Sequence, residues 1–434
     1  MTKIISFESF DVRFPTSTML DGSDAMNADP DYSAAYLRLK TDSLVTGDSL
    51  VFTIGRGNDV QIAAIDILAD KVVGLDLDDA FTNIGAIAKD LSSDSQLRWL
   101  GPDSGVFHMA TGAVLNSLWD LFSKKKGLPL WKFLSEMTPE QTVGAIDFRY
   151  ISDAINIGQA LEILNRGADN KSKNEVLLLS QGVPAYTTTP GWLGYSDEKM
   201  LKLSQSAIDD GFALIKYKCG KSLVDDRRRL TKIRELVGPD FPIAIDANQV
   251  WDVDVAINWV NSLREFNLRW IEEPTHPDDV LGHARIAREV APTPVATGEM
   301  ASSRIIFKQL LQSKAISVMQ IDASRVAGVN ENLANVLMAA KFNVPVCPHA
   351  GGVGLCEMVQ HMAMWDAVAV TGHHQNRVVE YIDHLHEHFL EPVRIAKGRY
   401  MPPQLPGAGA HMHQSSIDEF VFPTGGYWKN GINK

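Results

Sequence analysis

Six ionisable residues recur through the second half of the chain, each at the end of a short apolar run. Successive members of this series are 28, 26, 27, 23 and 27 residues apart. A strand, a helix and two short loops need about this length. The spacing therefore predicts an α/β fold with a (β/α)8-type barrel, in which polar residues at the carboxyl ends of the strands converge on one mouth. The six residues are Lys218, Asp246, Glu272, Glu299, Asp322 and His349.

Asp246, Glu272 and Glu299 end three consecutive predicted strands. Carboxylates that lie together repel one another unless a cation neutralises them, and oxygen ligands select a hard divalent ion, for which Mg²⁺ is the first candidate. The alternative is three separate ion pairs with neighbouring lysines or arginines. Three acidic strand ends in succession, at matched spacing, favour the Mg²⁺ site.

Lys216 and Lys218 lie two residues apart on one predicted strand, so their side chains share a face. Each positive charge is expected to lower the pKa of the other lysine, which would allow one of them to act as a base. A solvated strand face is the alternative interpretation of such a pair. The lysine pair lies on the strand just before the three strands that end in carboxylates, and this position favours a catalytic role.

Asp322 and His349 end the sixth and seventh predicted strands. A carboxylate against one imidazole nitrogen fixes the tautomer and stabilises the imidazolium, leaving the other nitrogen to face a substrate. Two further polar residues are expected at the same mouth. Glu380 lies at or near the eighth strand, and Asn248 follows Asp246 by two positions and faces the same way.

The first part of the chain has a different pattern. Residues 3–14, 33–42 and 49–55 are predicted strands, the last two forming a hairpin, and helical periodicity follows them. This order predicts an α+β domain over residues 1–135. The segment between the first two strands, residues 15–32, is polar and interrupted by glycine and proline, and we interpret it as a lid over the barrel mouth.

The barrel is predicted over residues 136–394. Its first strand fits residues 143–148, and its second strand begins at residue 212. The interval contains residues 182–196, GVPAYTTTPGWLGYS, whose aromatic and hydroxyl side chains suit an active-site loop. A plain loop packed on the first domain is an equally good interpretation of this segment.

Two segments could form the last strand of the barrel, residues 368–372 or residues 377–380, and the sequence leaves both open.

Residues 395–434 are predicted to form a tail that returns to the first domain. The alternating histidines of DHLHEHF could in principle bind zinc, but no cysteine lies nearby, so we do not assign a zinc site. These histidines are His384, His386 and His388.

Composition limits the classes of partner. The net charge is −12 and there is no long basic run, which argues against nucleic acid as the main partner. No apolar stretch reaches membrane-spanning length, and the amino terminus lacks a signal-peptide core. Three cysteines without a CxxC pair indicate a reduced, intracellular chain. We expect a soluble cytoplasmic protein that forms a homo-oligomer and binds a small molecule.

The strings at the predicted strand ends carry a family resemblance. KYK at 216–218, DAN at 246–248 and WIEEP at 270–274, with the later Glu, Asp and His, resemble the mandelate racemase subgroup of the enolase superfamily. Longer strings make the chain most similar, within that subgroup, to the L-fuconate dehydratases, over essentially its whole length. These strings are DVRFPTS, LDGSDAMNADPDYSAAY, RWLGP, IDFRY, PAYTT, GWLGYSDEK, WIEEPT, VNENL, PHAGGVGLCE and DHLHEHF.

The resemblance implies a fold and a set of roles. It implies an α+β capping domain, built from both ends of the chain, over a modified (β/α)7β barrel. Asp246, Glu272 and Glu299 would hold one Mg²⁺ ion. Lys218 would be the base at the α-carbon, and His349, paired with Asp322, would act from the other face. The implied substrate-binding residues are Asp24 and Tyr32 in the lid, together with Lys218, Asn248, Glu299, His349 and Glu380.

The implied reaction is dehydration of a sugar acid, most simply L-fuconate, to a 2-keto-3-deoxy acid through an enediolate that Lys216 and Glu380 help to stabilise. Alternatives are a racemase or epimerase, a dehydratase of a different acid sugar, and a non-catalytic sugar-acid binding protein. Seven residues depart from the family pattern near the expected pocket wall, and they bear on substrate preference rather than on reaction class. They are Tyr217, Cys219, Val250, Met300, Ala301, Ser302 and Ser303.

Overall fold

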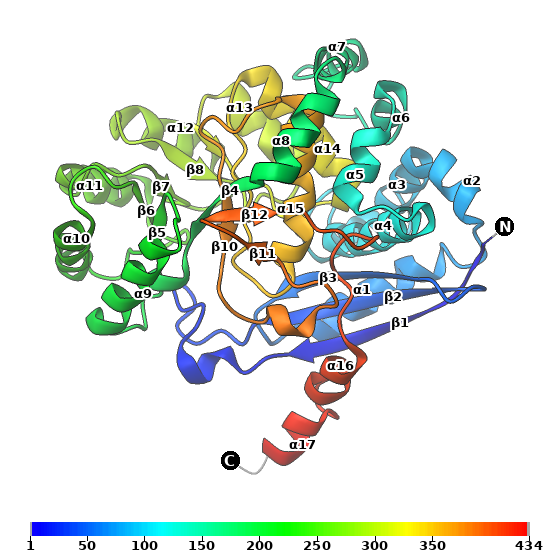
Figure 1. Cartoon of the computed structure of the whole chain (residues 1–434), viewed down its shortest axis with the longest axis horizontal. Helices are drawn as coiled ribbons and strands as arrows, with labels where there is room; N and C mark the ends of the chain where they lie inside the picture. Colours follow the sequence, from blue (N-terminus) through cyan, green and yellow to red (C-terminus); the bar gives the residue numbers. More distant parts are fainter. Residues whose placement is uncertain (1, 432–434) are drawn as a thin grey trace.

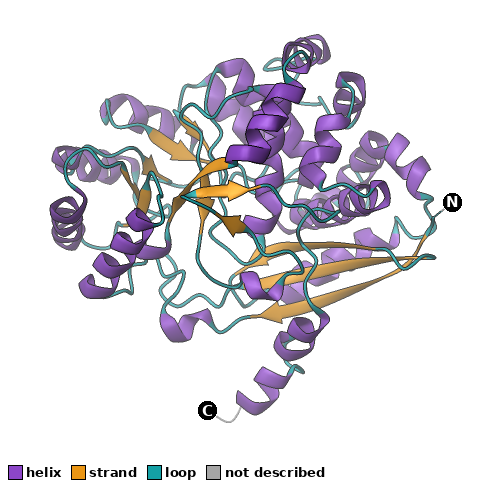
Figure 2. Ribbon diagram, in the orientation of Figure 1, coloured by secondary structure: helices purple, strands orange, loops and turns teal. Residues whose placement is uncertain are grey.

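An antiparallel sheet of three strands forms the first part of the computed structural model, which describes residues 2–431 (Figure 1). The strands are β1 (Ile4–Arg13), β2 (Ser33–Thr41) and β3 (Thr46–Thr53), and Phe10 lies opposite Tyr36 in the register of the first pair. The predicted strands and hairpin are therefore present, although β3 begins three residues earlier than expected. The sheet extends on one side of the barrel (Figure 2).

Helices cover this sheet and connect it to the barrel. The longest, α4, is buried along most of its length because it contacts both β3 and the barrel helix α14. It approaches the barrel backbone closely at Gly112, where an added Cβ atom would lie 2.2 Å from the carbonyl oxygen of Val326. The helices before the barrel are α1 (Asn58–Asp70), α2 (Leu77–Thr82), α3 (Ile84–Ser92), α4 (Gly105–Lys126), α5 (Leu130–Glu136), α6 (Pro139–Gly144), α7 (Ile157–Ala168) and α8 (Lys171–Gln181), with the short turns η1 (Thr16–Met19) and η2 (Arg98–Leu100).

The barrel consists of parallel strands that alternate with helices and then close on themselves. Residue 346 bridges to β9, and β10 pairs with β4, so eight strand positions complete the ring. The strands are β4 (Val183–Thr187), β5 (Ile215–Lys218), β6 (Ile243–Asp246), β7 (Ile271–Glu272), β8 (Val295–Thr297), β9 (Val318–Met319) and β10 (Val379–Tyr381). The segment 346–349, which bonds to β9 and the residues after it, takes the seventh position. The helices are α9 (Asp197–Asp209), α10 (Leu223–Val237), α11 (Val253–Ser262), α12 (Val280–Glu289), α13 (Arg304–Gln312), α14 (Gly328–Phe342) and α15 (Leu355–Trp365), with the turns η3 (Thr189–Gly191), η4 (Arg264–Phe266), η5 (Asp366–Val370) and η6 (His386–His388).

The predicted first barrel strand at residues 143–148 is wrong. The short helix α6 ends at Gly144, and the following residues form a loop. Thr138 and Gln141 form a capping box, with Pro139 at the first helical position, and these signals favour a helix over a strand. The first strand is instead β4, inside the segment for which a loop had been expected.

The last strand is resolved in favour of the second alternative. Residues 366–370 form a π-helical turn that continues α15, whereas β10 begins at Val379.

The C-terminal tail follows the prediction only in part. Its strands β11 (Arg394–Ile395) and β12 (Arg399–Met401) extend the barrel sheet beside β4, and only the later residues reach the first sheet, where Val421 bridges to Val12. The chain then ends in α16 (Gln414–Phe420) and α17 (Gly426–Gly431).

A layer of buried side chains fills the barrel below the carboxyl ends of its strands. Each member comes from a different one of seven successive strand positions, as barrel interiors require. This packed layer closes the barrel, so the polar residues above it face a mouth with a solid floor. Its members are Tyr186, Leu214, Ala244, Trp270, Ala296, Val318 and Cys347. Among residues 2–431, no helix is long and apolar enough to cross a membrane.

Candidate active site

The carboxylates of Asp246, Glu272 and Glu299 lie together at the carboxyl ends of β6, β7 and β8. Each offers one oxygen within 4.8 Å of the oxygens offered by the others, and all three residues are buried. One Glu299 oxygen, Oε2, has no hydrogen-bond partner among the described residues. Three buried carboxylates at one place, one of them with an oxygen that accepts no hydrogen bond, fit a hard divalent cation.

The charges in this group are incompletely balanced without a cation. Burial raises the pKa of Glu272 to about 8, with Asp246 and Glu299 acting in the same direction and Lys216 opposing them. The indole Nε1 of Trp270 donates to Glu272 Oε2 at 2.9 Å, which fixes one oxygen of the carboxylate. The other oxygen, Oε1, accepts a hydrogen bond from Lys216.

The two lysines of β5 both point into this region, as expected. Lys216 is fully buried and lies 3.0 Å from Glu380 Oε1 and 3.4 Å from Asp246 Oδ2. Lys218 donates from Nζ to Asp246 Oδ2 at 2.6 Å. The predicted lowering of the lysine pKa is not found. Burial lowers the pKa of Lys218, but the carboxylates of Asp246, Glu299 and Asp24 together raise it by more, so the pKa lies above its usual value.

His349 and Asp322 form the expected pair. His349 Nδ1 lies 2.8 Å from Asp322 Oδ2, and the other oxygen of Asp322 accepts from the backbone N–H of Ser324 at 2.6 Å. His349 Nε2 lies 3.5 Å from Glu299 Oε2. Burial lowers the pKa of His349, but Glu299 and the bond to Asp322 raise it to about 9, so the imidazolium is favoured at neutral pH.

Glu380 on β10 connects the lysine side of the site to the histidine side. It lies 3.0 Å from Lys216 Nζ, and its Oε2 accepts from the backbone N–H of Ala350 at 3.0 Å. The Thr188 hydroxyl donates to its other oxygen. Burial raises the pKa of Glu380, but Lys216, His349, Lys218 and the Thr188 hydroxyl together lower it by more, so Glu380 is a carboxylate.

A cavity of about 430 Å³ opens above these residues, between the lid and the barrel mouth. Several predicted residues lie below its surface rather than on it. Lys216, Asp246, Glu272, Asp322 and Glu380 are at most 1% exposed and form its buried base. The predicted residues that line the cavity are Asp24, Tyr32, Lys218, Asn248, Glu299 and His349.

The lid is held against the barrel by a second loop. The backbone N–H of Leu193 donates to Ser23 O at 3.0 Å, and that of Gly194 donates to Ser23 Oγ at 2.9 Å. The Tyr195 hydroxyl donates to Asp21. These contacts place Asp24 inside the cavity, where burial raises the pKa of its carboxyl although Lys218 opposes the shift.

Tyr32 forms part of the same wall. Its ring packs edge-on against Phe52, with centroids 5.0 Å apart, and stacks on His384 at 5.5 Å. Of the DHLHEHF histidines, His384 therefore packs against the lid residue Tyr32. His386 Nδ1 lies 2.6 Å from Glu357 Oε1, and the ring of His388 stacks on Phe14 at 4.4 Å. Among the described residues, only the three barrel carboxylates form a group with metal-ligand geometry.

Sequence reasoning did not single out three residues of the site. Trp192 lines the cavity, and its ring centroid lies 5.6 Å from Lys218 Nζ. The Thr188 hydroxyl donates a hydrogen bond to the Glu380 carboxylate. Both lie in the segment 182–196, so its aromatic and hydroxyl content was the available signal. Arg325, which donates to Phe52 O at 2.7 Å and also lines the cavity, had no such signal.

The departures from the family pattern lie mostly outside the cavity, contrary to expectation. Tyr217 alternates with the two inward lysines of β5, so it points outward, and its hydroxyl lies 2.8 Å from Ser204 Oγ on α9. Cys219 is buried, and Val250 lies beside Gly220. Of the seven departures, only Met300 lines the cavity.

The sequence matches the family described as "Enolase C-terminal domain-like" over residues 199–416. The chain belongs to the enolase superfamily. The structure is similar over nearly its whole length to the crystal structure of human mitochondrial enolase superfamily member 1. The TM-score is 0.97 and the sequence identity is 48%, and the match covers 99% of this chain and 98% of the human chain. These findings confirm the predicted superfamily and the predicted capping domain and barrel.

Two further relatives are named as sugar-acid dehydratases. L-galactonate dehydratase of Hypocrea jecorina is 48% identical over 425 residues, 97% of this chain and 94% of the relative. A crystal structure of an L-talarate/galactarate dehydratase mutant liganded with Mg and L-glucarate has a TM-score of 0.74 and 25% identity, covering 96% of this chain and 91% of that chain.

Proposed function

We propose that this protein is a Mg²⁺-dependent dehydratase of a sugar acid. The observation that carries the proposal is the placement of two proton-transfer groups on one cavity. Lys218 comes from the second barrel strand and His349 from the seventh, and both side chains line the cavity above the three carboxylates. Elimination of water requires one group that removes a proton and a second group that donates a proton to the leaving oxygen.

Mg²⁺ is the cofactor in this proposal, and Asp246, Glu272 and Glu299 are the residues that would hold it. When bound, Mg²⁺ supplies positive charge that stabilises the negative charge developing on a substrate carboxylate. Support comes from the three buried oxygen donors, from the Glu299 oxygen that accepts no hydrogen bond and from the Mg²⁺-liganded structure of the dehydratase relative.

The residues of the chain then divide the chemistry between them. Lys218 takes the proton from the carbon next to the substrate carboxylate, an assignment that depends on its position in the cavity. The electrons move toward the carboxylate oxygens, where the positive charge of Lys216 stabilises them. His349, held by Asp322 as an imidazolium, donates its Nε2 proton to the hydroxyl that leaves from the next carbon. The enol that remains becomes a 2-keto-3-deoxy acid.

L-fuconate is the proposed substrate, on the resemblance of the long lid and barrel strings to L-fuconate dehydratases. L-galactonate is the second candidate, because one relative of 48% identity is named for that substrate. The two acids differ by a single hydroxyl on the last carbon. Asp24 and Tyr32 are proposed to contact the distal part of the sugar chain, because both lie on the lid side of the cavity.

A panel of aldonic and aldaric acids tests the proposal. Each acid is incubated with Mg²⁺ and the protein, and keto-acid formation is followed by reaction with semicarbazide. We expect product from L-fuconate, with L-galactonate turned over less efficiently, as the ratio of the two kcat/KM values would show. Appearance of an inverted epimer without keto acid would instead identify a racemase. Binding without turnover across the panel would identify a binding protein.

A further inference from the structure

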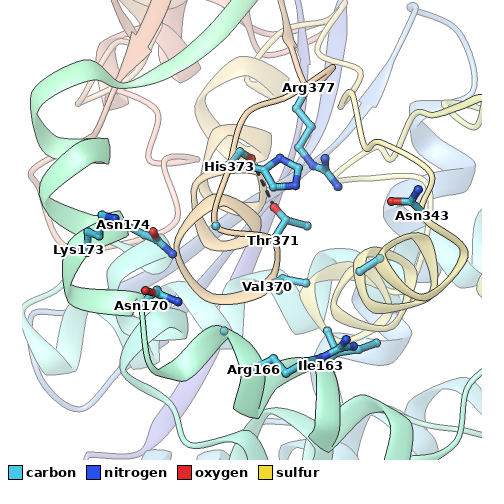
Figure 3. A pocket seen from close by; sticks show the side chains of 13 residues that line it. Ile163, Arg166, Asn170, Lys173, Asn174, Asn343, Val370, Thr371, His373 and Arg377 are labelled. Atoms are coloured by element: carbon cyan, nitrogen blue, oxygen red, sulfur yellow. Dashed lines mark hydrogen bonds between the residues drawn. The ribbon is translucent and has the colours of Figure 1, made fainter.

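A second cavity, of about 510 Å³, lies between α7, the start of α8, the end of α14 and the turn before β10 (Figure 3). It is separate from the active site. Asn343 and Arg377 lie just before the seventh and eighth barrel strands, so the cavity adjoins the amino-terminal ends of strands whose carboxyl ends carry the active site. The proposed reaction uses none of its lining residues.

The charge of this cavity is opposite in sign to that of the whole chain. Three cationic side chains line it, those of Arg166, Lys173 and Arg377, and none of its lining residues is acidic. The chain as a whole has a net charge of −12. A concave surface with one sign of charge concentrates ligands of the opposite sign, even on a protein of unfavourable net charge.

The cationic groups are available to a ligand. Among the described residues, neither Arg166 nor Lys173 forms a salt bridge, and Arg377 is held at one edge by Asp366, with Nε 3.1 Å from Oδ2. The terminal nitrogen Nη2 of Arg377 has no hydrogen bond within the described residues. Figure 3 shows this guanidinium, with His373 beside it, directed into the hollow.

Neutral donors complete the lining. Asn170 and Asn174 lie on the α8 side of the hollow, and Asn343 lies on the side of α14 (Figure 3). Asn174 donates to Val368 O at 3.2 Å, which fixes the amide in place. Guanidinium, ammonium and amide donors around one space suit a ligand with several oxygen acceptors, because charge-assisted hydrogen bonds are the strongest that such a surface can form.

We propose that this cavity binds a small anionic molecule that carries phosphate or carboxylate groups. The volume admits a metabolite-sized ligand, and three cations line the space that it would occupy. The inference is independent of the reaction proposed above, because it uses different residues at the other end of the barrel.

Titration calorimetry at low ionic strength, on the Mg²⁺-loaded protein in a buffer without anionic components, tests the proposal. Inorganic phosphate and tricarballylate are the probes, and they distinguish a phosphate ligand from a carboxylate ligand. The test variant is Arg166→Ala with Lys173→Ala. Both side chains are exposed and form no described ion pair, so the variant should fold. The control is Lys89→Ala with Lys202→Ala, which removes the same charge from exposed positions elsewhere.

We expect at least one probe to bind at one site per chain, with affinity reduced roughly tenfold or more in the test variant, the size expected for a lost charge-assisted hydrogen bond. The control variant should bind within about twofold of the parent, since distant exposed charges are screened. Absence of binding by both probes, or equal losses in the two double variants, would overturn the proposal. Loss of binding in Lys218→Ala would also overturn it, because the anion would then occupy the active site.

Discussion

The imidazole of His349 and the carboxylate of Asp322 meet at 2.8 Å between Nδ1 and Oδ2, across the ends of neighbouring barrel strands. This contact turns the other imidazole nitrogen toward Glu299 and the cavity. Two backbone N–H groups and a hydroxyl donate to the second oxygen of Asp322, so the carboxylate is itself fixed in orientation. The pair is therefore suited to hold a proton at His349 Nε2.

Asp322→Asn should lower kcat by roughly 10²- to 10⁴-fold, because an amide neither stabilises the imidazolium nor fixes its tautomer. KM should change little, since Asp322 does not line the cavity. The matched control is Ser324→Ala, which removes only one donor to the same carboxylate and should cost far less. Steady-state keto-acid formation measures both, and equal losses would show that the pair is not needed.

His349→Asn should abolish dehydration while leaving proton removal by Lys218 in place. The variant should therefore still exchange the α-proton of the substrate with solvent deuterium, whereas Lys218→Ala should not. Proton magnetic resonance of recovered substrate distinguishes the two variants. Exchange that is lost in His349→Asn and kept in Lys218→Ala would reverse the assigned roles of acid and base.

Asp24→Ala should reduce discrimination among sugar acids more than it reduces metal affinity, because Asp24 lies in the lid wall of the cavity and is not one of the three grouped carboxylates. The measurement is kcat/KM for L-fuconate against acids that differ at one distal hydroxyl. Asp29→Ala, at an exposed position of the same loop, is the control. If the ratios for Asp24→Ala match those of the parent, this residue does not contact the distal hydroxyls.

Much of the barrel could be predicted from the sequence because its strand ends carry the chemistry. Lys218, Asp246 and Glu272 occupy equivalent positions on adjacent strands, and the observed register aligns each with the next. The first strand escaped prediction because β4 is marked by no charged residue at its end and contains Pro184. The pKa of Lys218 also could not be predicted, because it depends on a 2.6 Å contact between strands.

Glu331→Gln should lower the free energy of unfolding by about 3 kcal/mol, since it breaks a buried charge network between the two parts of the molecule. Glu331 Oε2 lies 2.6 Å from His108 Nε2, and Oε1 lies 3.1 Å from Arg304 Nη1. The control is Lys308→Ala, which breaks an ion pair with the exposed Asp153 and should cost less than about 1 kcal/mol. Denaturant titration compares the two, and equal values would contradict the assigned role of the network.

Stability should fall with acid partly through His361. Burial lowers the pKa of His361 to about 3, against 6.5 in the unfolded chain. Between these values the unfolded state binds more protons than the folded state, so this contribution is complete above pH 6.5 and is lost as pH falls toward 3. The loss approaches about 1.4 kcal/mol per pH unit in that window. His361→Gln should therefore weaken the decline of Tm between pH 6.5 and 4.5, and an unchanged decline would contradict the assignment.

The central claim is that Asp246, Glu272 and Glu299 hold the Mg²⁺ ion on which dehydration depends. The most direct test is keto-acid formation from L-fuconate as Mg²⁺ is added back to EDTA-stripped wild type and to Glu272→Gln. We predict no product from the stripped enzyme, saturable recovery in the wild type, and no recovery in the variant at the same Mg²⁺ concentrations. Full turnover by the metal-free enzyme, or by Glu272→Gln, would contradict the account.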